Sequence, residues 1–494
     1  MKSKGLWICT VAALAVAVAL AGCGTTYYVA GRSLPPSGEQ YRVLVAIQNP
    51  NAIESGELEV MDAYYDEKST YNGTQRAIFI SGYSGSLPLT IQNMPEEQEG
   101  AVYGAGDGSF ALINYQKENE LGNVSGLGGL SSSIFITRSQ NFVFAANQES
   151  HVLTVVNRTA NTSVALGLPD VYRVSVNPGG TVAMAFVQDS NYAYYARQLT
   201  TAQSVQYSGG PSSWPKAAVD CEPQNGPSWC LFQVQSPDAI DSTGNYYGAP
   251  LVFDRPVKAV FSADGSIAYI LNCGPECGGN KSSVSLLPTA PMVFTPGEQS
   301  GLFPCNTAPC ANSKAAPITN IPLPGGASNA LVDTSTMYVV GQEPEQISGQ
   351  TLFGGHLTVV NLANNTASAP VSISDGLPGA LSRMVEGDDN TLWIGMTGCI
   401  TGVRAATDAP SGFGCLTMYN TASKTVTLEP YLGNDTGIAA ITGLHKIYTA
   451  EGGQVYIYST VNGSAIDNQF VTVTGTASDV AYMDAVSDAD NTVY

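Results

Sequence analysis

Cysteines are the residues whose type and spacing most directly predict chemistry in this sequence. Ten occur, and eight of them form four near-neighbour pairs: Cys221 and Cys230, Cys273 and Cys277, Cys305 and Cys310, and Cys399 and Cys415. In a chain with an export signal, an even number of cysteines predicts disulfides, and we expect neighbours to pair. Each bond would stabilise the fold by about 2–3 kcal/mol. A zinc site built from the second and third pairs is the alternative, which their spacing and an oxidising compartment disfavour.

Histidines offer little acid–base chemistry. The three are His151, His356 and His445. Two of them begin equivalent strands of a repeat, so we interpret them as recurring positions of that repeat and not as a cluster. The chain has no Gly-x-Ser-x-Gly elbow, no His-Glu-x-x-His motif, no phosphate loop and no Cys-x-x-Cys-His haem motif. We therefore predict no catalytic residue, no metal site and no cofactor.

Two acidic stretches could offer oxygen ligands to Ca²⁺. They are residues 386–390 (EGDDN) and 484–490 (DAVSDAD), and neither has the spacing of an EF-hand loop. Both fall where turns are expected, and backbone geometry favours Asp and Asn in turns. Turn formation is the preferred interpretation, with Ca²⁺ binding as the alternative.

The net charge excludes one class of partner. The chain has 40 acidic and 20 basic side chains, giving −20 at pH 7. Such a surface repels phosphate backbones, so we predict no nucleic-acid binding. The excess acid either keeps the protein soluble or attracts cations and basic partners.

The N-terminus carries a targeting signal. Lys2 and Lys4 precede an apolar segment, residues 6–20, that is too short for a stable membrane anchor. It ends in Leu-Ala-Gly-Cys at Cys23, which resembles the lipobox of bacterial lipoproteins. That resemblance implies removal of residues 1–22 and attachment of acyl chains to Cys23, through which the protein would bind a membrane.

A tether is expected after the lipidation site. Residues 23–40 are rich in Gly, Ser and Pro and would hold a globular body away from the membrane. Gly24, rather than Asp, follows Cys23, which by resemblance to lipoproteins of diderm bacteria favours the outer membrane. We expect a cell-envelope protein with its body in the periplasm or at the cell surface.

The rest of the chain repeats one strand pattern. Residues 355–366 (GHLTVVNLANNT) recur closely as 151–162 (HVLTVVNRTANT) and 415–425 (CLTMYNTASKT). Turns such as 263–266 (ADGS) join earlier strands of each unit, since Gly accepts positive φ and Asp bonds nearby backbone. The sequence predicts an all-β fold. Eight strands of the repeated type begin near residues 58, 110, 153, 192, 283, 357, 416 and 455.

This pattern resembles the YVTN/YncE-like family of β-propellers. The matching segments are 262–265 (SADG), 142–147 (FVFAAN), 357–361 (LTVVN) and 364–366 (NNT). The resemblance implies seven blades, whereas the strand count favours eight. We therefore expect residues 41–494 to form a β-propeller of seven or eight four-stranded blades, closed by pairing of the N- and C-terminal strands.

Cysteine-bearing insertions interrupt the repeat at about 198–256, 273–320 and 397–415. Long cross-linked loops on a rigid scaffold often carry recognition. Candidate binding residues of the first insertion are Trp214, Trp229, Tyr246 and Tyr247. The alternative is that these loops only cover a face of the propeller.

Three functions fit these features. The preferred one is a lipid-anchored, non-catalytic binding or assembly scaffold whose partner is an envelope protein or glycan. The second is a propeller enzyme, lactonase- or hydrolase-like, with a metal in the central channel; the fold alone does not establish such a site. The third is a structural or surface-layer protein.

Overall fold

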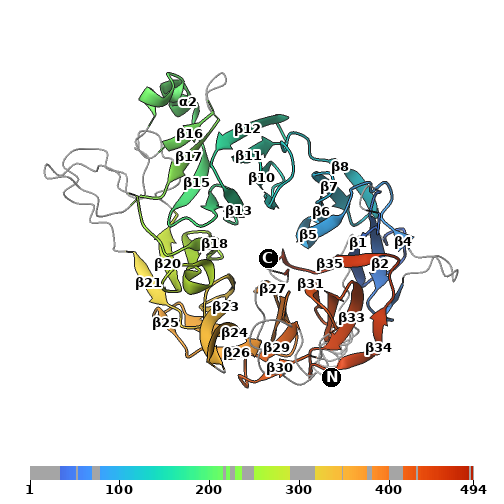
Figure 1. Cartoon of the computed structure of the whole chain (residues 1–494). Coiled ribbons are helices and arrows are strands. Elements are labelled where there is room, and N and C mark those ends of the chain that lie inside the picture. Colours follow the sequence, from blue (N-terminus) through green and yellow to red (C-terminus); the bar gives the residue numbers. More distant parts are fainter. Residues whose placement is uncertain are drawn as a thin grey trace, which may run out of the picture.

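The chain folds as an eight-bladed β-propeller in the computed structural model (Figure 1). The structure describes residues 34–51, 54–68, 78–214, 218–222, 228–235, 250–289, 318–347, 349–374, 381–399, 415–429, 432–488 and 491–492. Within these ranges, five sheets have four strands and three carry a fifth. The expected all-β propeller is confirmed, and the number of blades is eight.

The strands follow the chain blade by blade. Blade 1 holds β5 (Pro88–Met94), β6 (Glu99–Gly104), β7 (Ser109–Asn114) and β8 (Asn119–Asn123). Blade 2 holds β9 (Ser133–Ile136), β10 (Phe142–Asn147), β11 (Val152–Asn157) and β12 (Thr162–Gly167). Blade 3 holds β13 (Val171–Val176), β14 (Ala183–Val187), β15 (Ala193–Gln198), β16 (Ala218–Cys221) and β17 (Trp229–Gln233). Blade 4 holds β18 (Pro256–Phe261), β19 (Ile267–Asn272), β20 (Ser283–Pro288) and β21 (Thr319–Pro322).

The second half continues in the same way. Blade 5 holds β22 (Asn329–Asp333), β23 (Thr336–Ile347), β24 (Gln350–Asn361), β25 (Thr366–Ala367) and β26 (Val371–Ser374). Blade 6 holds β27 (Leu381–Gly387), β28 (Thr391–Met396), β29 (Leu416–Asn420) and β30 (Val426–Leu428). Blade 7 holds β31 (Asp435–Ile441), β32 (Lys446–Glu451), β33 (Gln454–Ser459) and β34 (Ala465–Val471). Short helices are η2 (Pro95–Glu97), α2 (Thr201–Tyr207), η3 (Pro211–Ser213) and η4 (Gly274–Cys277).

Blade 8 closes the ring with both ends of the chain. β35 (Thr476–Tyr482) pairs with β1 (Arg42–Gln48), which continues to β2 (Glu57–Asp62), β3 (Glu67–Lys68) and β4 (Ile78–Phe79). This confirms the expected pairing of N- and C-terminal strands. Because the first and last strands are hydrogen-bonded, the ring has no open sheet edge at this point.

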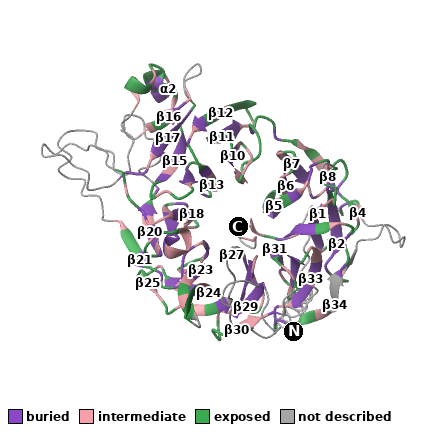
Figure 2. Cartoon of the chain, viewed as in Figure 1, coloured by how far each residue is buried: buried purple, intermediate pink, exposed green. Residues whose placement is uncertain are grey.

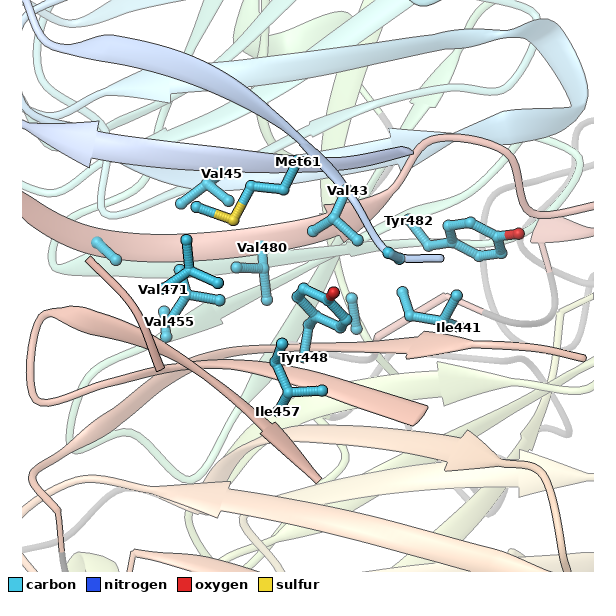
Figure 3. Close-up of a cluster of buried hydrophobic side chains, with 14 of the residues drawn as sticks. Val43, Val45, Met61, Ile441, Tyr448, Val455, Ile457, Val471, Val480 and Tyr482 are labelled. Carbon is cyan, nitrogen blue, oxygen red and sulfur yellow. The ribbon is translucent and has the colours of Figure 1, made fainter. Parts of the chain in front are cut away.

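The core lies between neighbouring blades. Figure 3 shows Val43 and Met61 of blade 8 packed against Tyr448 and Ile457 of blade 7, and all four are fully buried. Side chains point alternately to the two faces of a strand. In β1, Val43, Val45 and Ile47 pack against blade 7, and Leu44 and Ala46 pack against blade 1, so blade 8 is covered by its two neighbours. In Figure 2 the buried segments accordingly run along the strands, and exposure concentrates at turns and outer strands.

Turn residues take the conformations that the repeat predicts. In the turn before β19, the Asp264 carboxylate accepts from the Ser266 amide at 3.0 Å, and Gly265 has φ +69°. In the turn after β24, the Asn361 side chain accepts from the Ala363 amide at 2.9 Å. These local bonds explain why Asp, Asn and Gly mark the strand ends.

Each blade begins on the inside of the ring. The first strand of a blade lies nearest the axis and contacts the first strand of the next blade (Figure 1). We call the face where these inner strands begin the upper face, and the face where they end the lower face. Among the described residues, none of the helices is long and apolar enough to cross a membrane.

Candidate functional site

Bulges shape the start of the inner strands. In six of the eight blades, the register between the inner strand and its partner shifts by one residue near the upper face. Bulges of this kind redirect side chains and are common beside functional sites. The residues that follow the shift, in chain order, are Thr90, Arg173, Lys258, Arg383, Gly437 and Asp479. Ser133 and Asn329 hold the corresponding places in blades 2 and 5.

Three of these equivalent positions carry cations. Arg173, Lys258 and Arg383 lie in blades 3, 4 and 6, and Asn329 occupies the place in blade 5 between them. We call the three basic side chains the cationic arc. Lys258 is only 7% exposed, and its Nζ donates to Asn329 Oδ1 at 2.7 Å. Arg383 Nε donates to the Thr436 carbonyl of the next blade at 2.9 Å.

Like charges and burial act together on Lys258. Removal from water, followed by the charges of Arg173 and Arg383, lowers the pKa of Lys258 well below its usual value. Each of these influences disfavours the protonated ammonium. The charges of the two arginines therefore act on the lysine, and the three basic side chains occupy the same place in the repeat.

Two buried acids, Asp435 and Asp479, lie on the inner strands of blades 7 and 8, and one carboxylate oxygen of Asp435 has no described hydrogen-bond partner. Asp479 is fully buried and accepts from the amides of Ile91 and Val480 at 2.7 and 2.9 Å. Asp435 is also fully buried, and burial followed by the charge of Glu451 raises its pKa well above the usual value. Asp479 therefore fastens blade 8 to blade 1, and Asp435 favours its neutral form.

A pocket of about 680 Å³ opens on the upper face between blades 3 and 4. Its walls include Gln188, Arg255 and Glu276, and Tyr172 and Val257 directly precede the first two cations of the arc. The Tyr172 hydroxyl donates to the Val257 carbonyl at 3.4 Å, which joins the two blades at the pocket. We call this hollow the upper pocket.

A disulfide-bonded turn holds one wall of the upper pocket. Cys273 is bonded to Cys277 around η4, which carries Glu276. The Glu276 carboxylate accepts from the Gln342 amide at 2.9 Å, and burial raises its pKa to about 7. A carboxyl group that titrates near neutrality is thus fixed in the wall of the pocket, which Arg255 also lines.

Two other cysteine pairs are bonded as expected. Cys221 is linked to Cys230 and Cys399 to Cys415. Cys305 and Cys310 lie outside the described residues, as does Cys23. The bonds at 221–230 and 399–415 lie in blade 3 and at the edge of blade 6, away from the pocket lining.

The lower end of the channel is covered by the C-terminal segment. Asn491 and Asn93 of blade 1 bond each other at 2.8 and 3.0 Å, and the Thr492 hydroxyl donates to the Ile438 carbonyl of blade 7. Asp488 pairs with Arg138 at 3.1 Å. A hollow of about 180 Å³ remains between this segment and blades 1, 2, 7 and 8.

The predicted aromatic binding residues are dispersed. Trp229 is 2% exposed, and its ring meets Phe142 edge-on at 5.2 Å beside a lower-face groove of about 390 Å³. Trp214 packs against the core of blade 3, and its indole donates to the Tyr207 carbonyl at 3.2 Å. Tyr246 and Tyr247 lie outside the described residues. The structure does not bring the two tryptophans together, and a binding role for these residues stays a prediction.

The histidines and the acidic turn at residues 386–390 do not line the upper pocket. His445 bonds Asp389 at 2.8 Å in lower-face turns, His356 pairs with Glu345 at 2.9 Å, and His151 is exposed on the rim. The Asp388 carboxylate accepts from the Gly443 and His445 amides, as turn chemistry predicts. In the part of the chain that the structure describes, no three His, Cys, Asp or Glu side chains are grouped to hold a metal ion.

The solved structures that resemble this chain do so at low similarity. No protein-family model and no curated protein sequence matches it. The solved dihydro-heme d1 dehydrogenase NirN is 11% identical, with 90% of this chain and 75% of that chain covered and a TM-score of 0.49. A periplasmic gluconolactonase of Pseudomonas aeruginosa is 14% identical over 89% and 98% of the two chains, with a TM-score of 0.38.

A putative 6-phosphogluconolactonase of Bacteroides fragilis is 10% identical over 90% of this chain and 98% of that chain, with a TM-score of 0.39. At such scores the similarities carry no argument about activity. The function is therefore argued from the site of this chain alone.

Proposed function

We propose that this protein is a lipid-anchored cell-envelope β-propeller that acts as a non-catalytic binding or assembly scaffold and engages its partner at the upper face. The upper pocket carries this proposal, because it is the larger hollow at a channel mouth and rigid elements form its walls. Sites of this volume with a few convergent polar groups are typical of ligand binding.

The side chains of the upper pocket suit recognition. Tyr172 offers an aromatic ring, Gln188 an exposed amide and Arg255 a guanidinium, so the pocket can stack on and hydrogen-bond to a polar partner. An envelope protein or a glycan has this chemistry. None of the three histidines lines the pocket, and no described carboxylate group suits a metal.

Anchoring follows from the sequence. The Leu-Ala-Gly-Cys motif at Cys23 supports lipidation, and residues 24–40 would give the ring reach from the membrane. More than one acyl chain would hold the protein firmly, since each buried methylene adds about 0.8 kcal/mol. We propose the outer membrane, with the propeller in the periplasm or at the cell surface.

Capture from detergent-solubilised envelope tests the binding role. The wild-type chain is expected to recover one specific partner, and Gln188→Trp, which fills the upper pocket, to reduce the recovery about tenfold. Ser139→Trp is the matched control, because Ser139 lines the lower groove, and recovery should stay at the wild-type level.

Fractionation of the cells that express the protein tests anchoring: Cys23→Ser should move the chain from the membrane to the soluble fraction.

Two results would overturn the scaffold proposal. One is equal recovery by the Gln188→Trp and wild-type chains; the other is a stoichiometric, tightly held metal together with measurable turnover.

A further inference from the structure

The cationic arc is a group of basic residues in a protein whose net charge is strongly negative. The chain as a whole carries −20, yet Arg173, Lys258 and Arg383 gather within four consecutive blades at the start of the inner strands. Their bulges place them at equivalent positions, so the spacing is set by the ring and not by loop conformation. A cluster so fixed is preorganised, and its field needs no rearrangement before a ligand binds.

Lys258 lacks a countercharge among the described residues. Its ammonium has one described hydrogen-bond partner, the neutral Asn329 side chain at 2.7 Å, and no described carboxylate pairs with it. Buried charges in proteins are ordinarily paired. Here the fixed charges that act on Lys258 are positive. The protonated ammonium is therefore least stable when no anion is bound.

The buried acids of blades 7 and 8 do not supply that countercharge. Asp479 is engaged with two backbone amides across the blade 8–blade 1 junction, and Asp435, raised in pKa by burial, accepts from the Gly437 amide at 3.2 Å. Neither forms an ion pair with Lys258. A countercharge for Lys258 would therefore have to come from outside the described residues, whereas the charge of Arg383 already acts on Asp435.

We propose that the cationic arc binds a small oxyanion with at least two negative charges, of the di- or tricarboxylate or phosphomonoester class. This rests on the proposed function, since it assigns a ligand class to the upper mouth. Guanidinium groups present paired donors to carboxylate or phosphoryl oxygens, and an ammonium adds a compact charge. Arg173 and Arg383 are partly exposed, whereas Lys258 is buried.

Binding would also change the protonation of Lys258. An anion in contact with the ammonium favours its charged form, which the two arginines otherwise oppose. The groups that act on it are Arg173 from β13, Arg383 from β27 and the neutral Asn329 from β22. A proton should therefore be taken up with the anion at pH values above the lowered pKa.

Calorimetric titration of the full chain in detergent, at low ionic strength, tests this assignment. Citrate and succinate probe the carboxylate source, and inorganic phosphate and glycerol 3-phosphate the phosphoryl source. We expect one site per chain for at least one of these classes. Titration in two buffers of different ionisation enthalpy should show proton uptake.

Matched variants locate the site. Lys258→Met should weaken binding by about tenfold or more and abolish proton uptake, and Arg173→Gln should weaken it by about fivefold. Lys281→Met, which removes an exposed lysine, should leave affinity unchanged. Should Lys258→Met not fold, the Arg173→Gln and Lys281→Met pair decides the question.

Absence of binding by all four probes, or equal affinity in wild type and both arc variants, would overturn the assignment. The result stays separable from the scaffold proposal. A chain that captures its envelope partner but binds no anion rejects only the ligand class, whereas a chain that binds an anion but captures nothing rejects the scaffold.

Discussion

At the scale of residues, the chemistry of this protein centres on charges that the ring holds in place. Lys258 is buried and subject to the charges of Arg173 and Arg383, whereas Asp479 joins blade 8 to blade 1 and Asp435 bonds the Gly437 amide of its own strand. Basic residues thus occupy the repeated position in blades 3, 4 and 6, and an acid occupies it in blade 8.

The pH dependence of stability should report the state of Lys258. Its pKa is lowered in the folded chain, so between that lowered value and the usual 10.5 the unfolded chain binds more protons. The contribution of Lys258 to the free energy of unfolding should therefore rise with pH across this window, by at most about 1.4 kcal/mol per pH unit.

Denaturant unfolding of wild type and Lys258→Met at several pH values between about 7 and 10 measures this effect. The difference in unfolding free energy, wild type minus variant, should increase with pH. The buried tyrosines titrate in both chains, so their contribution cancels in the comparison. A difference that stays constant with pH would show that Lys258 has an ordinary pKa.

At the scale of elements, the ring is closed by a strand pair that joins the two ends of the chain. Arg42 at the start of β1 bonds Asp484 just after β35 at 2.6 Å and Glu118 of blade 1 at 3.0 Å. Its side chain is 5% exposed, and that of Glu118 is 3% exposed. One buried guanidinium therefore links three segments far apart in the sequence.

Arg42→Met should destabilise the chain by about 3 kcal/mol, because it leaves two carboxylates in the interior without their cation. Arg138→Met is the control: that arginine is 49% exposed and pairs with Asp488, so its loss should cost less than about 1 kcal/mol. Chemical denaturation of both variants measures the difference. Equal stability of the two variants would mean that Arg42 does not secure the closure.

The sequence predicted the strands and turns better than it predicted the site. Turn residues such as Asp264 and Gly265 mark strand ends through local bonds, and counting the repeated strands indicated eight blades. The site was missed because its three cations are far apart in the chain and meet only through the ring. A signal existed: Tyr-Arg-Val at 172–174, Val-Lys-Ala at 257–259 and Ser-Arg-Met at 382–384 occupy the same place in the repeat.

Aromatic content was a weaker guide than repeat position. The tryptophans of the first insertion suggested a recognition loop, yet Trp229 belongs to β17 and packs with Phe142 and Phe144 in the interior. A large apolar ring gains more from burial than from exposure, so composition alone cannot separate core from surface. Charged residues at inner-strand positions have no such ambiguity.

At the scale of the whole molecule, the two faces of the ring differ. The lower end of the channel is occupied by the C-terminal segment around Asn491, whereas the upper pocket keeps a volume of about 680 Å³ beside the cationic arc. Because the lower end is covered, we expect a partner to bind at the upper face. The proposed scaffold role depends on that asymmetry.

Site-specific photocrosslinking in cells tests the proposed direction most directly. A benzophenone amino acid is placed at position 188 in the upper pocket or at position 139 in the lower groove, with the chain anchored through Cys23. We predict a discrete adduct with an envelope component from position 188 and none from position 139. An adduct from position 139 alone, or from neither position, would contradict recognition at the upper mouth.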